Sequence, residues 1–153
     1  PDAPQGPAPE HVLGASDELL RSAGLSRPKL AALRDLAERT AAGEIPTLAE
    51  AQALADDELI ERLTAVRGIG RWTVEMMLMF QLGRPDVLPV DDLGVRKGAQ
   101  LLDKLDEMPK PKALAERGEA WGPYRTLASL YLWRIADGEG VVEPAKRVKR
   151  SQE

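Results

Sequence analysis

The stretch VRGIGRWTVEMMLMF, residues 66–80, places two glycines one residue apart between two segments with helical patterns. The segment before it, residues 56–66, has acidic residues in its first turn and apolar residues on one face. The segment after it, residues 71–83, is apolar nearly all round, which predicts a central, buried helix. The fold therefore depends on why the chain breaks at the Gly-Ile-Gly turn (residues 68–70).

Two interpretations of the Gly-Ile-Gly turn compete. In the first, it is an ordinary helix-helix connection in which glycines supply a positive φ. In the second, it is a helix-hairpin-helix, in which glycines let backbone N–H groups approach a DNA phosphate closely. The N-terminus of the following helix would then add the positive end of its dipole. Such a contact binds DNA without reading its sequence, and the turn alone does not decide between the two.

The rest of the chain reads as helix almost throughout. Capping residues (Ser16, and Thr47 with Glu50 in capping-box spacing), prolines such as Pro28, and apolar spacing predict helical segments over 16–24, 27–43, 47–54, 91–103, 108–121 and 122–138. We find no β pattern and no repeat, so the predicted fold class is all-α. We expect a flexible N-terminal segment (1–7), one domain (8–138) that contains the hairpin (59–83), and a basic, mobile tail (139–153).

The composition excludes several classes of function. The 153 residues include no cysteine and one histidine, which excludes disulfides, thiol catalysis and an iron-sulfur cluster in this chain and leaves little for a zinc site. No apolar run reaches the roughly 20 residues of a membrane helix, and the polar, Pro-rich start is no signal peptide. We therefore expect a cytoplasmic protein without a membrane partner. With a formal charge of -4, a nucleic-acid binder would need local basic or backbone features.

A second motif, LPVDDLGVRKG (residues 88–98), carries two adjacent carboxylates at a predicted helix start. Asp91 or Asp92 could be a helix cap that accepts backbone N–H groups. Alternatively, one of them could stabilise the oxocarbenium-like transition state of glycosidic chemistry. Among only six aromatic residues, Trp72 follows the turn directly, where a helix start is usually exposed. A tryptophan there suits stacking on a base.

Together these motifs resemble the helix-hairpin-helix/Gly-Pro-Asp superfamily of DNA glycosylases, and within it the AlkA-type enzymes (3-methyladenine DNA glycosylase II). The matching segments are GIGRWT (68–73), DVLPVDDLGVRKG (86–98), WGPYRTLASLYLWR (121–134) and, upstream, GLSRPKLAALRDLA (24–37). The resemblance covers roughly residues 8–136. It implies a helical bundle and a base excision repair enzyme that flips an alkylated base, such as 3-methyladenine, out of double-stranded DNA and hydrolyses its N-glycosidic bond.

The resemblance also assigns roles at the carboxylates and beside the hairpin. It implies that Asp92, which lies 24 residues after Gly68, is catalytic. Asp91 is the runner-up, since the pattern of sister families reads Val-Asp-x-His. Bifunctional relatives carry a nucleophilic lysine where this chain has Trp72, which implies a monofunctional enzyme without a strand-cleaving lyase step.

The remaining site residues come from the resemblance as well. The implied base pocket contains Trp72, Trp133, Met76, Leu93 and Tyr124, with Met76 and Leu93 standing where some relatives have tyrosines. Tyr124 and Trp121 could each be core or pocket rim. The implied phosphate contacts are Gly68, Gly70, Arg71 and Thr73. The backbone carbonyls of Thr64, Val66 and Ile69 match a structural Na⁺ or K⁺ site, and no cofactor is implied for catalysis.

The resemblance further implies a monomer that acts on the chromosome, which is cytoplasmic in a bacterium. Family members have more helices before residue 8, and these carry the residue that fills the gap left by the flipped base. We therefore expect that this chain lacks the family's N-terminal helices and that Pro1 starts a fragment or an incompletely represented chain. Two rival hypotheses remain: a non-catalytic helix-hairpin-helix DNA-binding module, and an all-α interaction domain without a nucleic-acid partner.

Overall fold

The computed structural model describes residues 8–138. The segments 1–7 and 139–153, expected to be flexible or mobile, lie outside the described residues. The described part contains helices and no strand, which confirms the predicted all-α class. In chain order its elements are α1 (Pro9–Gly14), α2 (Asp17–Ser22), α3 (Arg27–Ala41), α4 (Leu48–Ala53), α5 (Asp56–Thr64), α6 (Arg71–Phe80), α7 (Leu93–Leu102), α8 (Pro111–Gly118), the 3-10 helix η1 (Glu119–Trp121) and α9 (Arg125–Ala136).

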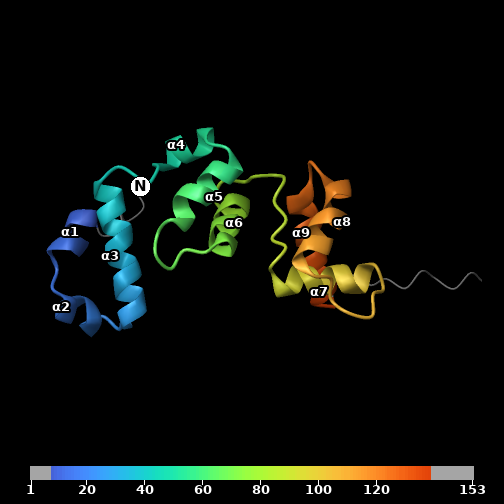
Figure 1. Cartoon of the computed structure of the whole chain (residues 1–153), viewed down its shortest axis with the longest axis horizontal. Helices are drawn as coiled ribbons and strands as arrows, with labels where there is room; N and C mark the ends of the chain where they lie inside the picture. The colour runs from blue at the N-terminus through green and yellow to red at the C-terminus, as the bar shows by residue number, and fades with distance from the viewer. Residues whose placement is uncertain (1–7, 139–153) are drawn as a thin grey trace, which may run out of the picture. The chain divides into compact units, whose positions relative to one another are not determined.

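The chain divides into two compact units at the end of the hairpin. The N-terminal unit is Pro1–Gly83 and the C-terminal unit is Arg84–Glu153. Figure 1 shows α1 to α6 of the first unit in blue to green and α7 to α9 of the second in yellow to red. The single predicted domain, 8–138, is therefore built as two units. No helix within residues 8–138 has the length and apolar character that crossing a membrane requires.

The long helix α3 organises the first half of the N-terminal unit. Pro28 lies in its first turn, as predicted, and the Ser26 hydroxyl accepts from the Lys29 N–H at its start. Helices α1 and α2 pack against α3 (Figure 1). Arg34 of α3 donates to the carbonyl oxygens of Val12 and Ala15, so one guanidinium ties the end of α1 and the following linker to α3.

The second half of the N-terminal unit is the helical hairpin. Helix α4 begins at the predicted capping box of Thr47 and Glu50. Helices α5 and α6 then pack side by side around the turn, which confirms the predicted helix pair (Figure 1, green). The prediction that the second helix is buried all round is wrong, because α6 exposes its first turn and Phe80. Its buried apolar residues are Val74, Leu78 and Met79, and they lie on one face only.

In the C-terminal unit, α7 packs against α9 around a core that α8 and η1 complete. The core residues are Val95, Ala99, Leu114 and Leu132, and Trp121 packs against them. Trp121 is half-buried and packs against this core, as one of its two predicted alternatives requires. The predicted helix over 122–138 begins later than expected, at Arg125. Pro123 lies between Gly122, the C-cap of η1, and Tyr124, the N-cap of α9, so it precedes α9 instead of opening it.

Candidate active site

The Gly-Ile-Gly turn holds its two glycines in different backbone conformations. Gly68 has a φ of +79°, and a Cβ placed on it would lie 3.0 Å from the Ala32 Cβ. Gly70 has a φ of −94° and forms the extended N-cap of α6, and a Cβ there would meet nothing within 4 Å. The expectation that the glycines of the turn supply a positive φ therefore holds for Gly68 and is wrong for Gly70. Of the two glycines in this turn, only Gly68 is required by the fold.

The turn is anchored to α3 by one carboxylate. The backbone N–H of Arg67, just before the turn, donates to Asp35 Oδ2 at 2.7 Å. This hydrogen bond, together with hydrogen bonds from the Arg39 side chain, lowers the pKa of Asp35 below its ordinary value. Asp35 thus fixes the hairpin turn relative to the helix that precedes it by more than twenty residues.

The first turn of α6 presents the residues that were assigned to DNA. Its N-cap is Gly70, so no side chain caps the helix, and Trp72 remains 49% exposed at its start. Thr73 is exposed as well. Arg71 Nε donates to Glu75 Oε1 at 3.0 Å, so the buried Glu75 holds the exposed guanidinium of Arg71 near the helix start. The uncapped backbone and these exposed side chains form a surface that an anion could approach.

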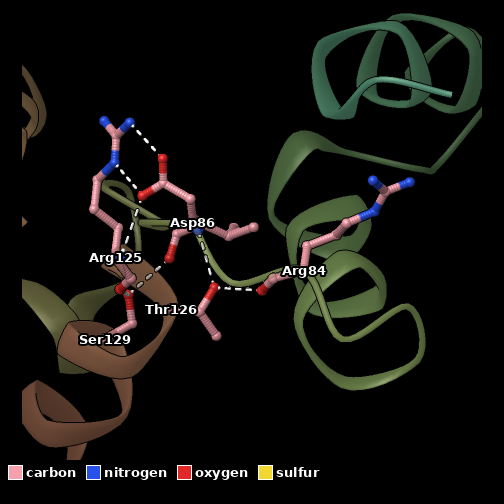
Figure 2. A network of polar contacts seen from close by, with 6 residues as sticks. Arg84, Asp86, Arg125, Thr126 and Ser129 are labelled. Carbon is pink, nitrogen blue, oxygen red and sulfur yellow. Dashed lines mark hydrogen bonds and ion pairs between the residues drawn. The ribbon is translucent and has the colours of Figure 1, made fainter. Parts of the chain in front are cut away.

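In the C-terminal unit, a tight polar network ties the segment before the Asp motif to the start of α9 (Figure 2). Asp86 accepts two hydrogen bonds from the Arg125 guanidinium, at 2.7 and 2.8 Å. The Thr126 hydroxyl donates to the Arg84 carbonyl and accepts from the Val87 N–H. The Ser129 hydroxyl donates to the Val87 carbonyl. Side chains of α9 thus satisfy the backbone of the extended segment that leads to Asp92.

We expect this network to make the free energy of unfolding depend on pH in the acid range. The Arg125 guanidinium lowers the pKa of Asp86, so the folded state prefers the carboxylate. The stabilisation is then fully present above the unfolded pKa of about 4 and is lost as the pH falls through the lower folded pKa. Asp86→Asn should cost about 1 kcal/mol of unfolding free energy at pH 7. In urea denaturation this cost should shrink below about pH 4, and a cost that stays constant with pH would contradict the ion-pair role.

The exposed Asp106 offers a matched control for this measurement. Asp106→Asn removes a carboxylate from the same unit without breaking an ion pair with Arg125. It should leave the unfolding free energy at pH 7 within about 0.5 kcal/mol of the unchanged protein. A loss equal to that of Asp86→Asn would show that the effect comes from general charge removal.

Asp92 caps α7 and is held by two donors. Its Oδ1 accepts from the Val95 backbone N–H at 2.9 Å and from the Trp133 indole Nε1–H at 2.8 Å. Asp91, by contrast, is exposed and lies before the helix. The cap interpretation is therefore correct for Asp92, and it does not compete with a chemical role. A carboxylate at a helix N-terminus faces the positive end of the dipole, which favours its ionised form.

The other base-pocket candidates lie in both units. Trp72 and Met76 are four residues apart on α6, and Met76 is half-buried. Leu93, in the first turn of α7, is 66% exposed, and Tyr124, just before α9, is 65% exposed. Trp133 of α9 is half-buried and contacts Asp92 directly. Within the C-terminal unit the structure therefore joins Asp92 to Trp133, while Leu93 and Tyr124 offer exposed side chains.

Three residues that hold candidate residues in place were not singled out from the sequence: Asp35 in the N-terminal unit, and Arg125 and Gly94 in the C-terminal unit. Asp35 and Arg125 act through contacts with residues more than thirty positions away, which no local pattern reveals. Gly94 had a visible signal, because it is the glycine of the Asp-Leu-Gly motif. A Cβ on Gly94 would lie 2.7 Å from Trp133 Cδ1, so its role became clear only once the indole was placed.

The described residues contain no cluster of histidine, aspartate and glutamate side chains suited to a metal ion. The cation site implied at the hairpin would use backbone carbonyls instead. Of these, the Val66 oxygen accepts the Ile69 N–H at 3.1 Å. A carbonyl oxygen has a second lone pair, so this hydrogen bond is compatible with an additional ligand role.

The family comparison covers most of the chain. Residues 3–123 match the model of the HhH-GPD superfamily base excision DNA repair proteins. The DNA-3-methyladenine glycosylase 1 of Schizosaccharomyces pombe is 44% identical over 145 residues, which cover 93% of this chain and 64% of that protein. A putative DNA-3-methyladenine glycosylase of Bacillus subtilis, YfjP, is 35% identical over 84% of this chain and 44% of its own length. The chain thus spans less than two thirds of these relatives.

Solved structures agree with the sequence matches. The 3-methyladenine DNA glycosylase of Schizosaccharomyces pombe, in complex with abasic DNA, superposes with a TM-score of 0.75 at 45% identity. The match covers 85% of this chain and 63% of that one. A DNA-3-methyladenine glycosidase from Bacillus halodurans also gives a TM-score of 0.75, at 44% identity, over 84% of this chain and 58% of its own.

Proposed function

The chain belongs to the HhH-GPD superfamily of base excision DNA repair proteins, and from this premise we propose that it carries the catalytic region of a monofunctional DNA glycosylase. Its substrate would be double-stranded DNA with alkylated bases such as 3-methyladenine, the base in the names of the similar proteins. The observation that carries the proposal is Asp92, a carboxylate fixed at a helix N-terminus within the matched region. The enzyme would act as a monomer wherever the chromosome lies.

In the proposed mechanism, Asp92 stabilises the positive charge that develops on the deoxyribose as the base leaves. Alkylation gives a purine a positive charge and makes it a better leaving group, so little general acid is needed. The main requirement is a preorganised carboxylate near the oxocarbenium-like sugar. Tyr124, in the same unit as Asp92, offers an exposed aromatic face that is suited to attract a cationic base. Trp72 stands where bifunctional relatives carry a lysine, which supports base release without strand cleavage.

The hairpin would bind a DNA phosphate by its backbone. Gly70 is exposed, and its missing side chain leaves the uncapped start of α6 open to close approach. Arg71 and Thr73 are exposed in the same turn. We include a structural Na⁺ or K⁺ at the carbonyls of Thr64, Val66 and Ile69 in this proposal, between the hairpin and the phosphate.

Gly70→Val offers a clean test of phosphate binding, because the fold does not need glycine there. We expect a roughly ten- to hundredfold loss of affinity for any duplex, damaged or not, since the valine side chain blocks close approach to a charged acceptor. Stability should fall by about 1 kcal/mol or less, because valine is a poor N-cap. Fluorescence anisotropy with undamaged and methylated duplexes measures the affinity. A loss confined to the methylated duplex would contradict the phosphate role.

Gly68→Ala tests the conformation of the turn, because Gly68 is the glycine of the pair with a positive φ. Alanine at a φ of +79° and 3.0 Å from the Ala32 Cβ should cost stability, by about 1–2 kcal/mol. Affinity measured well below the melting temperature should then fall less than in Gly70→Val. If both variants lose stability and affinity in proportion, the turn is only a structural connection.

The activity itself is tested by base release from methylated duplex DNA in the full-length protein. We expect free 3-methyladenine and intact abasic strands, which break only after alkali. Binding without base release would favour the non-catalytic DNA-binding module. No measurable DNA affinity would favour the interaction domain, and strand breaks without alkali would contradict the monofunctional assignment.

A further inference from the structure

Trp133 has a geometry that a base-stacking role does not require. Its indole Nε1–H points at Asp92 and donates to Oδ1 at 2.8 Å, although the two residues lie 41 positions apart. The same oxygen accepts the Val95 N–H at 2.9 Å. Two donors from different helices, α7 and α9, thus converge on one carboxylate oxygen and fix the orientation of the group.

Gly94 makes room for this contact. A Cβ at position 94 would lie 2.7 Å from Trp133 Cδ1, 3.0 Å from Trp133 Nε1 and 3.2 Å from Asp92 Oδ1. The first distance is shorter than carbon atoms tolerate, and the indole ring is rigid, so any side chain there would push the ring or the carboxylate away. Gly94 lies within a helix at a negative φ, so the backbone conformation does not explain its presence. Glycine is required at this position because the indole ring of Trp133 occupies the space of a side chain.

The position of α9 is fixed independently of this contact. The ion pair of Arg125 with Asp86 and the bonds of Thr126 and Ser129 hold the first turns of the helix (Figure 2). Leu132, the neighbour of Trp133, is fully buried in the core. The indole donor is therefore held on a rigid element, as a preorganised site requires.

We propose that Trp133 is a positioning residue that holds the Asp92 carboxylate through its indole N–H, and that Gly94 is the clearance that this contact needs. This inference rests on the proposed function of Asp92 and changes the role of Trp133 from a wall of the base pocket to a partner of the carboxylate. The preorganised anion then meets the developing sugar cation without reorganising first.

Trp133→Phe separates the two roles of the tryptophan. Phenylalanine keeps an aromatic face for a base and loses the N–H donor. A hydrogen bond to a charged group contributes a factor of roughly ten to a hundred, so kcat for base release should fall at least about tenfold while KM stays nearly unchanged. The acid limb of the pH–rate profile should move to higher pH, because removing a donor from a carboxylate favours its protonated form. A raised KM with unchanged kcat and pH profile would overturn the proposal in favour of base stacking.

Gly94→Ala reaches the same contact by another route, because it leaves both polar groups in place. It should lower kcat and shift the acid limb in the same direction as Trp133→Phe. Trp121→Phe is the matched control, since that tryptophan packs against the same core and its ring lies under the Arg117 guanidinium. It should leave kcat and the pH profile unchanged at temperatures where it is folded. Wild-type kinetics in Gly94→Ala would contradict the clearance role.

An NMR measurement tests the contact without relying on activity. The indole N–H resonance of Trp133, assigned by its loss in Trp133→Phe, should move in Asp92→Asn, and the Trp121 resonance should not. If the chemical shift of the Trp133 indole N–H stays unchanged in Asp92→Asn, the positioning role is overturned even if the enzyme is active. Conversely, full activity of Asp92→Asn refutes the proposed function, whatever the resonance does. An inactive Asp92→Asn beside a fully active Trp133→Phe refutes the positioning role alone.

Discussion

Asp92→Asn should reduce the rate of 3-methyladenine release by roughly 10²–10³-fold, the usual loss when one electrostatic stabiliser is removed. Asparagine can still accept the Val95 N–H and cap α7, so the fold should survive. Its side-chain oxygen can also accept the Trp133 N–H. What it cannot supply is a full negative charge to an oxocarbenium-like sugar. The loss should therefore appear in kcat, with affinity for duplex DNA largely retained.

Asp91→Asn is the matched control, because Asp91 is the adjacent carboxylate, exposed and outside the cap. It should retain base release within about threefold, since surface substitutions usually change energies by no more than about 0.5 kcal/mol. Both variants are compared in the full-length protein, with thermal melting as the folding control. An inactive Asp91→Asn beside an active Asp92→Asn would assign the chemistry to the other carboxylate. Two active variants would reject the glycosylase mechanism and favour a DNA-binding module.

The local features of the fold were predictable because they follow from residues close together in the chain. The capping box of Thr47 and Glu50 and the Ser16 cap are made within four residues, and the structure contains both. The start of α9 was not predictable in the same way. The sequence places Pro123 inside a helical pattern, whereas the helix starts at Arg125, whose backbone N–H donates to Asp86, 39 residues earlier in the chain.

The candidate site shows the same limit. The Asp-Leu-Gly motif predicted that Asp92 lies at a helix start. Its capping role depends only on the backbone N–H of Val95, three residues later in the chain. The prediction for Gly70 was wrong, because a pair of glycines does not say which of them carries the positive φ. The Trp133 contact joins positions 41 residues apart. Periodicity cannot reveal such a contact, since it depends on how α7 and α9 cross.

That crossing leads to the largest expected loss of stability, in Gly98→Ala. Gly98 lies in α7 where it meets α9, and a Cβ there would overlap the Leu132 carbonyl oxygen and lie 2.8 Å from its Cα. These are backbone atoms, which no rotamer change can move, so the two helices would have to separate. We expect a loss of about 3 kcal/mol or more in urea denaturation followed by circular dichroism, despite the better helix propensity of alanine. Base release should fail with it, because Asp92 and Trp133 lie on the separated helices.

Two other helical glycines turn this prediction into a graded series. At Gly118 a Cβ would meet the Leu88 Cδ2 methyl, the end of a flexible side chain, so Gly118→Ala should cost less than Gly98→Ala. At Gly14 a Cβ would meet nothing within 4 Å, so Gly14→Ala should be neutral or slightly stabilising. Because all three substitutions add the same methyl group to a helix, differences among them report what that group touches. Equal stabilities for Gly98→Ala and Gly14→Ala would mean that α7 and α9 do not approach each other as closely as the structure places them.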